Sequence, residues 1–284
     1  MTISLEQTGV EMRQTASGSR VLHLSCEAFD ASIALTGGQL IAFTPEGGKP
    51  LLYLSPLAVE SPGKAIRGGV PICWPWFGAH PQDSSAPQHG YARTAEWELV
   101  SLDRTAAGFD IVLQGPCHQD LAAEVRYRLG EGVTVELTTR NLGTESRRVS
   151  AALHTYLAVS NAETIGVQGI GGTRYFDKTT GKEGTHAIDV LTCSGEIDRI
   201  IYTTNPVELQ DAGWNRTISI QSVGSGTTVL WNPGSEKSKA MKDLPDDGWQ
   251  HFFCVESAIA GDDARTLSAG KMHTLGTQLQ IKPL

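Results

Sequence analysis

Residues 121–129 read Leu-Ala-Ala-Glu-Val-Arg-Tyr-Arg-Leu, and residues 132–140 read Gly-Val-Thr-Val-Glu-Leu-Thr-Thr-Arg. Apolar and polar side chains alternate in both stretches, which is the period of a β-strand with one buried face. The segment Gly130-Glu131-Gly132 between them is short enough to close a hairpin. The two stretches therefore predict a pair of adjacent antiparallel strands.

The same alternation recurs along the rest of the chain, where few segments have the period of a helix. Further predicted strands span residues 21–25, 108–114, 216–223 and 227–231. Gly224-Ser225-Gly226 is short enough to close a second hairpin, between the last two of these strands. Only short helices are expected, one of them around residues 236–243. Many short strands separated by turns predict an all-β fold, a sandwich or a barrel.

The 284 residues contain no internal repeat and no low-complexity linker. Stretches rich in Pro and Gly lie at residues 45–50, 61–71 and 75–90, and we interpret them as long loops rather than domain boundaries. Long loops inside a β-domain are usually functional. We therefore expect one domain that spans residues 1–284.

The composition excludes several classes of protein. Hydrophobic residues make up 40% of the chain and charged residues 19%, which rules out a disordered protein. The formal net charge of −8 and the lack of a long Lys/Arg run disfavour nucleic-acid binding. No apolar stretch reaches about 18 residues, so neither a transmembrane helix nor another membrane partner is expected. No basic head precedes an apolar run at the N-terminus, so no secretory signal is expected.

The five cysteines are odd in number, widely spaced and without a C-x-x-C motif. This pattern predicts reduced, buried thiols and a cytoplasmic location. The sequence also lacks G-x-G-x-x-G, P-loop, zinc-ligand and G-x-S-x-G motifs. It therefore gives no support to hydride transfer, nucleotide hydrolysis, zinc hydrolysis or α/β-hydrolase chemistry, and no metal or cofactor is expected.

The densest group of chemically versatile residues lies between residues 67 and 93. In this Gly/Pro-rich stretch, the rings of Trp74, Trp76 and Phe77 suit the C–H faces of a polyhydroxylated ligand. The forked donors of Arg67 and Arg93 suit its oxygens. The alternative interpretation is that the rings plug one end of a sandwich and the arginines are solvated charges.

Two further segments carry single titratable residues on predicted strands. His154 shares one strand face with Tyr156, and an imidazole that titrates near pH 7 suits acid/base work. Its alternative role is a satisfied core histidine. Glu256 ends an apolar strand, where desolvation would raise its pKa toward that of a general base. Its alternative role is a solvated residue at the end of a strand.

Together these segments resemble the aldose 1-epimerase (mutarotase) superfamily, and more closely its glucose-6-phosphate 1-epimerase branch. Six blocks occur in the family's order between about residues 67 and 256. They begin at Arg67 (Arg-Gly-Gly-Val-Pro-Ile-Cys-Trp-Pro-Trp-Phe-Gly), Pro87 (Pro-Gln-His-Gly-Tyr-Ala-Arg), Leu153 (Leu-His-Thr-Tyr-Leu-Ala-Val-Ser), Gly195 (Gly-Glu-Ile-Asp-Arg-Ile-Ile-Tyr), Trp231 (Trp-Asn-Pro-Gly-Ser-Glu-Lys) and Phe253 (Phe-Cys-Val-Glu).

The resemblance implies a large antiparallel β-sandwich of the galactose-mutarotase type, with the site in a concave sheet face. It implies that His154 is the general acid and Glu256 the general base, which open and reclose the sugar ring without a cofactor. It also implies that the sugar phosphate is held by Arg67, Gln88, Arg93 and Asp198. His89, which belongs to the same block as Gln88, is expected in the binding site close to them. Gly234 and Ser257-Ala258 depart from the common family pattern and bear on substrate preference.

The expected reaction is the interconversion of the α and β anomers of hexose 6-phosphates, chiefly glucose 6-phosphate. Because a chain with a charge of −8 repels a phosphate dianion, binding requires a local cationic cluster, for which Arg67 and Arg93 are the candidates. Three alternatives remain open: a mutarotase for neutral sugars, a noncatalytic sugar-phosphate-binding module, and a glycoside-processing enzyme that uses Asp198 with Glu256. We expect a monomer whose partner is a small sugar phosphate.

Overall fold

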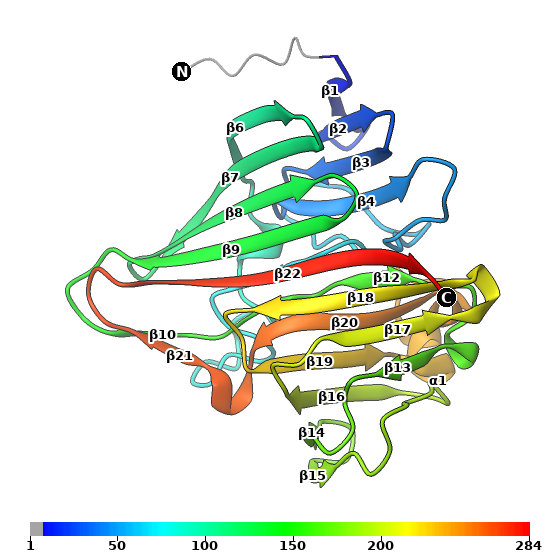
Figure 1. The fold of residues 1–284 in the computed structure, drawn as a ribbon. Coiled ribbons are helices and arrows are strands. Elements are labelled where there is room, and N and C mark those ends of the chain that lie inside the picture. Colours follow the sequence, from blue (N-terminus) through cyan, green and yellow to red (C-terminus); the bar gives the residue numbers. More distant parts are fainter. Residues whose placement is uncertain (1–7) are drawn as a thin grey trace.

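The computed structural model describes residues 8–284, and two eight-stranded antiparallel sheets form most of it (Figure 1). The first sheet contains the longest strands. Its order is β13 (Gly166–Gln168), β17 (Val207–Asp211), β18 (Arg216–Val223), β22 (Met272–Pro283), β9 (Val133–Asn141), β8 (Leu121–Leu129), β7 (Gly108–His118) and β6 (Glu98–Thr105).

The second sheet combines segments from very different parts of the chain. Its order is β15 (Lys182–Thr185), β14 (Arg174–Asp177), β16 (Ile197–Tyr202), β19 (Thr227–Asn232), β20 (Phe252–Ile259), β11 (Ala151–Leu153) and β5 (Ile72–Cys73), with β12 (Tyr156–Ala158) also on β20. Strand β20 joins the two parts of this sheet, because β19 pairs with one of its edges and β11 and β12 pair with the other.

Two smaller sheets and a few short helices complete the fold. A four-stranded sheet is formed by β1 (Val10–Gln14), β2 (Arg20–Cys26), β3 (Phe29–Ala34) and β4 (Gln39–Pro45), and a two-stranded one by β10 (Arg147–Val149) and β21 (Arg265–Leu267). The α-helix α1 spans Gly234–Ala240, and 3-10 turns span Ala92–Thr94, Ala162–Thr164, Ala212–Trp214, Gly248–His251 and Gly261–Asp263. Within residues 8–284, none of the helices is long and apolar enough to cross a membrane.

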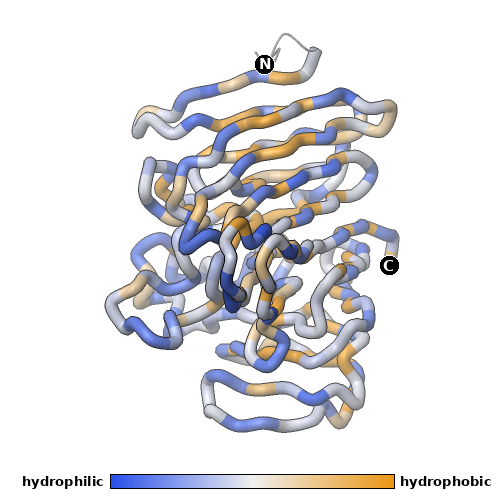
Figure 2. The backbone as a smooth tube through the Cα atoms, turned by 90° about the vertical axis from the view of Figure 1, so that its left-hand side faces the viewer, coloured by the Kyte–Doolittle hydropathy of each residue, from blue (hydrophilic) through white to orange (hydrophobic). Residues whose placement is uncertain are grey.

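Alternation along β20 divides its side chains between two apolar clusters. Phe253 and Val255 pack into the large core that the second sheet shares with the first. Phe252 and Cys254 point to the opposite face and join a smaller cluster. Hydrophobic positions recur along the stacked strands in the same way, while many turns are hydrophilic (Figure 2). Glu256 follows the alternation of the second group, so its carboxylate lies on the face of the smaller cluster.

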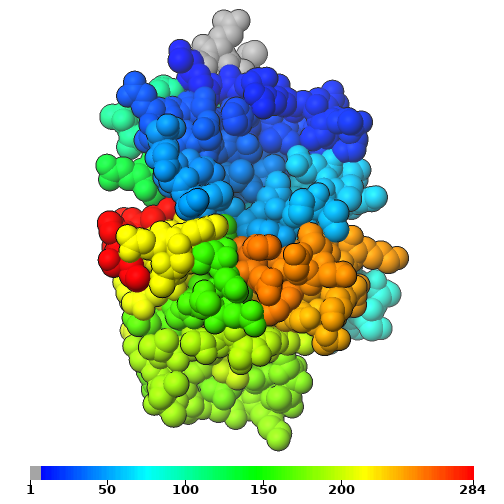
Figure 3. Space-filling view, turned by 90° about the vertical axis from the view of Figure 1, so that its right-hand side faces the viewer, coloured from blue at the N-terminus to red at the C-terminus, as the bar shows by residue number. Residues whose placement is uncertain are grey.

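Segments far apart in the sequence meet on one side of the molecule. In Figure 3 the blue N-terminal part lies directly above the orange and yellow segments of the C-terminal half. Hydrogen bonding ties these parts together, since the Ser55 hydroxyl donates to the backbone carbonyl of Asp243 at 2.7 Å. The site described below depends on this meeting, because its residues come from both halves.

The strands predicted from alternation are confirmed, and β8 and β18 have the predicted bounds. The turn at residues 130–132 closes the β8–β9 hairpin, where Leu129 pairs with Val133. The second predicted hairpin is wrong: β18 pairs with β17 and β22, whereas β19 pairs with β16 and β20. The chain crosses between the sheets at Gly224, whose φ of +68° and approach to the Thr274 carbonyl leave no space for a Cβ.

The cysteines are all free, and three of the five are buried as predicted. The prediction of buried thiols is wrong for Cys117, which is exposed, and Cys26 is half-buried. Cys117 lies at the end of β7, beyond an irregularity in the pairing with β8 that follows Gln114. A break in the ladder of this kind changes which side chains face the core.

Candidate active site

A cavity of about 270 Å³ lies on the face of the second sheet that carries Glu256. It brings together seven of the predicted catalytic and binding residues and one of the predicted rings, from segments up to 189 positions apart. Its lining comprises Arg67, Phe77, Gln88, His89, Arg93, His154, Lys178, Asp198, Trp231, Lys237, Met241 and Glu256.

The pairing of β20 with β11 and β12 places His154 beside Glu256. The prediction that His154 lies on a strand is wrong, because it falls in the break between β11 and β12, where its backbone N–H donates to the carbonyl of Pro71 at 2.9 Å. Its ring stacks on Tyr156 with 4.8 Å between centroids. The His154 Nδ1 is 3.4 Å from the Glu256 Oε1. Both side chains are buried, so the alternative of a solvated glutamate at a strand end is wrong.

Burial dominates the protonation of this pair. It lowers the pKa of His154 well below its usual range, and the nearby charges of His89, Arg67 and Arg93 act in the same direction. Burial raises the pKa of Glu256 well above its usual range, with a further contribution from Asp198 that Lys178 opposes. Without substrate, burial therefore favours a neutral imidazole beside a neutral carboxylic acid, so the pair carries one proton more than a neutral imidazole with a carboxylate.

His89 is held in a fixed tautomer by the backbone of the same loop. Its φ of 66° lies in the left-handed region, and its backbone N–H donates to the Gly78 carbonyl at 2.7 Å. In return the Gly78 N–H donates to the His89 Nδ1 at 3.3 Å. Burial, with Arg93, Lys178 and Arg67 nearby, lowers the pKa of His89 to about 3. A neutral ring that accepts at Nδ1 carries its proton at Nε2, so His89 can donate a hydrogen bond there.

Most cations around the cavity already have a carboxylate partner. Arg67 Nη2 is 3.1 Å from Asp243 Oδ2, Lys178 Nζ is 3.0 Å from Asp198 Oδ2, and Lys237 Nζ is 2.7 Å from Glu196 Oε1. Among the cavity-lining cations, Arg93 alone has no carboxylate within 4 Å anywhere in residues 8–284. Its Nη2 donates only to the backbone carbonyl of Gln88, at 2.8 Å.

Arg67 is a fixed part of the wall rather than a free charge. Its Nη1 donates to the Tyr156 hydroxyl at 2.9 Å, and its Nε donates to Asp243 Oδ2 at 3.2 Å. Burial opposes the charge, but Tyr156 and Asp243 outweigh it and raise the pKa of the guanidinium. Arg67 therefore stays charged and oriented at the edge of the cavity.

The cavity excludes two of the three predicted aromatic residues. Trp74 is fully buried in the core, where its indole N–H donates to the Thr139 hydroxyl at 3.0 Å. The Trp76 indole donates to the Pro87 carbonyl at 3.0 Å, and its ring packs edge-on against Tyr91 at 5.1 Å. For these two residues the structure favours the alternative role as structural plugs, and only Phe77 reaches the cavity.

Sequence patterns do not assign a role to four residues of the lining: Lys178, Trp231, Lys237 and Met241. Trp231 and Lys237 belong to the block that begins at Trp231, so the resemblance marks their segment without giving either residue a role. Lys178 follows Asp177 in a polar turn, where a lysine carries no signal of function. Within the described residues, no three His, Cys, Asp or Glu side chains are grouped so that they could hold a metal ion.

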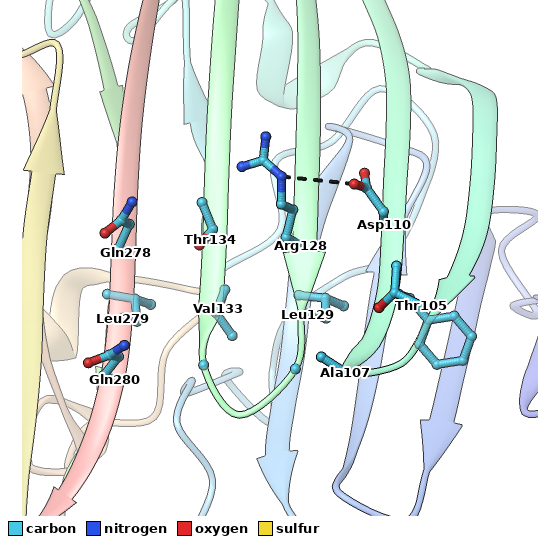
Figure 4. A pocket seen from close by; sticks show the side chains of 13 residues that line it. Thr105, Ala107, Asp110, Arg128, Leu129, Val133, Thr134, Gln278, Leu279 and Gln280 are labelled. Atoms are coloured by element: carbon cyan, nitrogen blue, oxygen red, sulfur yellow. Dashed lines mark ion pairs between the residues drawn. The ribbon is translucent and has the colours of Figure 1, made fainter.

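A second hollow lies at the hairpin ends of the first sheet, away from these residues (Figure 4). Asp110 and Arg128 line it, with 3.8 Å between Oδ2 and Nε, and each has a closer ion-pair partner, Arg126 for Asp110 and Glu136 for Arg128. The other lining residues are Thr, Ala, Phe, Leu, Gly, Val and Gln. This hollow has no buried acid/base pair, so the cavity beside His154 and Glu256 is the candidate active site.

Comparison with known proteins agrees with this geometry. Residues 20–280 match the sequence model of the aldose 1-epimerase family. The "Putative glucose-6-phosphate 1-epimerase" of Escherichia coli K12 is 32% identical over 255 residues, which cover 86% of this chain and 84% of that protein. The crystal structure of a "putative mutarotase" from Salmonella typhimurium has a TM-score of 0.91 at 28% identity, over 99% of this chain and 96% of that chain. A galactose mutarotase-like protein from Clostridium acetobutylicum, 13% identical, shares the fold with a TM-score of 0.72 over 97% of this chain and 98% of its own.

The chain therefore belongs to the aldose 1-epimerase family. The predicted fold, an antiparallel β-sandwich of the galactose-mutarotase type, is confirmed. The protein is accordingly a carbohydrate isomerase, which interconverts the anomers of a sugar at C1.

Proposed function

We propose that this protein interconverts the α and β anomers of hexose 6-phosphates, chiefly glucose 6-phosphate. One observation carries the proposal: Arg93, a cation with no carboxylate partner in residues 8–284, lines the same cavity as the buried His154–Glu256 pair. A guanidinium binds a phosphate through two parallel hydrogen bonds, whereas a neutral hexose needs no such charge. The relatives from E. coli and Salmonella typhimurium, each named "Putative glucose-6-phosphate 1-epimerase", add support.

The reaction needs one acid and one base that act together. Glu256 as the carboxylate takes the proton of the C1 hydroxyl, while His154 as the imidazolium gives a proton to the ring oxygen. The C1–O5 bond breaks and leaves an aldehyde, rotation about C1–C2 exposes the other carbonyl face, and the two proton transfers reverse as the ring closes. The pair starts and ends with one proton, so the cycle is balanced.

Substrate binding favours the ionised form of the pair. In the empty cavity Arg93 is one of the charges that lower the pKa of His154. A phosphate dianion on Arg93 offsets that charge, which raises the pKa of His154 again. The shared proton then shifts its preference from Glu256 to His154, whose Nδ1 lies 3.4 Å from Oε1 without a hydrogen bond between them within residues 8–284. The phosphate thus contributes to protonation of the general acid as well as to affinity.

The remaining contacts suit the sugar hydroxyls. His89 can donate from Nε2, and Gln88 and Asp198 also line the cavity. Asp198 Oδ1 and Glu256 Oε2 are buried atoms with no hydrogen-bond partner within residues 8–284. Buried polar atoms without partners are costly, and the hydroxyls of a bound sugar would satisfy them.

Exchange spectroscopy by NMR tests the proposal, since it measures the rate of anomer interconversion at equilibrium. The kcat/KM for glucose 6-phosphate is compared with that for glucose, both corrected for the buffer rate. A higher value for glucose 6-phosphate supports the proposal. Equal or higher values for glucose identify a neutral-sugar mutarotase instead, and saturable broadening without faster exchange identifies a noncatalytic binding module.

A further inference from the structure

Lys178 is the cavity residue whose place is least explained by the reaction described above. It follows β14 directly, and its backbone N–H donates to the Asp198 carbonyl at 2.8 Å. Its Nζ donates to Asp198 Oδ2 at 3.0 Å. The same ammonium group lies 5.3 Å from the centroid of the Phe77 ring, within the range of a cation–π contact. Backbone, carboxylate and ring therefore fix one cation at one place in the cavity.

The turn that carries Lys178 is itself held in place. The Asp177 Oδ1 accepts hydrogen bonds from the Thr179 N–H at 3.0 Å and the Thr179 hydroxyl at 2.6 Å. The Asp177 Oδ2 accepts from the Arg199 Nε at 3.0 Å. Lys178 thus begins from an anchored backbone, so a well-defined position of its ammonium group costs less conformational entropy.

Two carboxylates share this cavity, and Lys178 contacts one of them. Asp198 is on β16 and Glu256 on β20, with β19 between the two strands. The side chain of Asp198 is 15% exposed and that of Glu256 is 1% exposed. Two nearby carboxylates disfavour each other's ionised form unless a cation lies close. The reaction needs Glu256 as a carboxylate, and this requirement makes the neighbouring cation important.

We propose that Lys178 is a positioning residue for catalysis: it holds Asp198 by Oδ2, leaves Asp198 Oδ1 free for a sugar hydroxyl, and balances the charge of the carboxylate pair so that Glu256 can ionise. The proposal rests on the role of Glu256 as general base in the proposed function. It does not depend on the phosphate, so it holds for whichever sugar the enzyme turns over.

The charges around Glu256 support this role. Asp198 raises the pKa of Glu256, and Lys178 is the group that lowers it. Other charged groups line the cavity at Arg67, Arg93 and Lys237, and His154 and His89 face it as neutral rings. Of these, Arg67 and Lys237 are neutralised by Asp243 and Glu196. Arg93 lines the cavity without a carboxylate partner, but Lys178 is the cation whose charge acts on Glu256. Loss of Lys178 would leave the effect of Asp198 on Glu256 without an opposing charge.

The test compares Lys178→Met, Lys178→Arg and a matched control, Lys182→Met. Lys182 is an exposed lysine of the same hairpin that lies outside the cavity. In the Met variant the acidic limb of the kcat/KM profile is expected to move to higher pH. Each unit of that move lowers the rate on this limb about tenfold. Lys178→Arg is expected to restore most of the profile, and Lys182→Met is expected to match the wild type.

A simple phosphate contact would behave differently. It would raise KM for glucose 6-phosphate alone and leave the acidic limb of both substrates unchanged, and that result would overturn the proposal. All profiles are therefore recorded with glucose as well as glucose 6-phosphate. If wild type acts only on glucose, the proposed function fails while the role of Lys178 is still decided by the glucose profiles.

A measurement without turnover completes the test. The Glu256 carboxyl, labelled with carbon-13 and identified by its loss in Glu256→Gln, is titrated by NMR in the free protein. Its midpoint is expected at higher pH in Lys178→Met than in wild type, with Lys178→Arg close to wild type. An unchanged midpoint in Lys178→Met would overturn the proposal even for an inactive preparation.

Discussion

Replacement of Arg93 by alanine tests how the cavity distinguishes a sugar phosphate from a neutral sugar. The Arg93 guanidinium has a backbone carbonyl as its hydrogen-bond partner, at 2.8 Å, and no carboxylate within 4 Å in residues 8–284. Its removal therefore leaves no buried carboxylate unpaired, so the fold is expected to remain intact. The expected effect is weaker binding of the phosphate group that Arg93 would contact.

The size of the loss follows from the strength of hydrogen bonds to charged groups, about 1.5–3 kcal/mol. At 1.36 kcal/mol for each factor of ten, kcat/KM for glucose 6-phosphate should fall about 10- to 150-fold. For glucose it should change less than about threefold, because no phosphate is present. Loss of the same positive charge raises the pKa of His154 in the free enzyme, since Arg93 is one of the groups that lower it.

Exchange NMR on both sugars, at matched protein concentration and constant ionic strength, measures these values. Arg148→Ala is the matched control, because Arg148 is an exposed arginine outside the cavity. It should leave both sugars unaffected. Equal losses for glucose 6-phosphate and glucose in Arg93→Ala would refute the assignment of Arg93 as the phosphate contact.

Three further predictions concern the fold and the buried pair. Burial raises the pKa of Glu256, so the folded state binds this proton more tightly than the unfolded state does. Stability therefore falls as the pH rises from the pKa of the unfolded state toward that of the folded state. Glu256→Gln cannot lose this proton, so it should melt at a higher temperature than wild type in thermal scans, by a margin that grows from pH 5 to pH 8. Asp211→Ala removes the carboxylate 3.8 Å from buried Arg216 and should cost about 3–5 kcal/mol in urea unfolding, and an unchanged midpoint would contradict the reasoning. Gly90→Ala would place a Cβ 2.0 Å from the Trp74 carbonyl oxygen at a φ of +72°, so it should destabilise the loop of His89 by about 1–3 kcal/mol and lower kcat/KM for both sugars; wild-type values in urea unfolding and exchange NMR would contradict this.

Much of the fold could be predicted from the sequence because alternation is a local signal. The β8 and β9 stretches reveal their buried face in the order of their own side chains, and the intervening turn is short. Gly224 shows the limit of this reasoning. A Gly-Ser-Gly segment indicates a turn, but the sheet that receives the next strand is decided by long-range packing.

The sequence could predict the site residues whose side chains have a specific chemistry. It could not predict those whose role depends on where the fold places them. His154 and Glu256 are titratable residues in apolar segments, which the sequence shows, and only the pairing of β11 and β12 with β20 brings them within 3.4 Å. Trp74 and Phe77 look equally suited to sugar binding in the sequence, yet one lies in the core and one in the cavity. The segment around Lys178 gives no sign of its role, because that role depends on its contact with Asp198 on another strand.

The central claim is that this protein catalyses anomer exchange of glucose 6-phosphate through His154 and Glu256. The most direct measurement is exchange NMR of that sugar with wild type, His154→Asn and Glu256→Gln, each shown to be folded by its melting curve. The expected result is exchange well above the buffer rate for wild type and a rate near the buffer value for both variants. Wild-type rates in either variant would contradict the assignment of the acid/base pair, and no acceleration by folded wild type would contradict the proposed function.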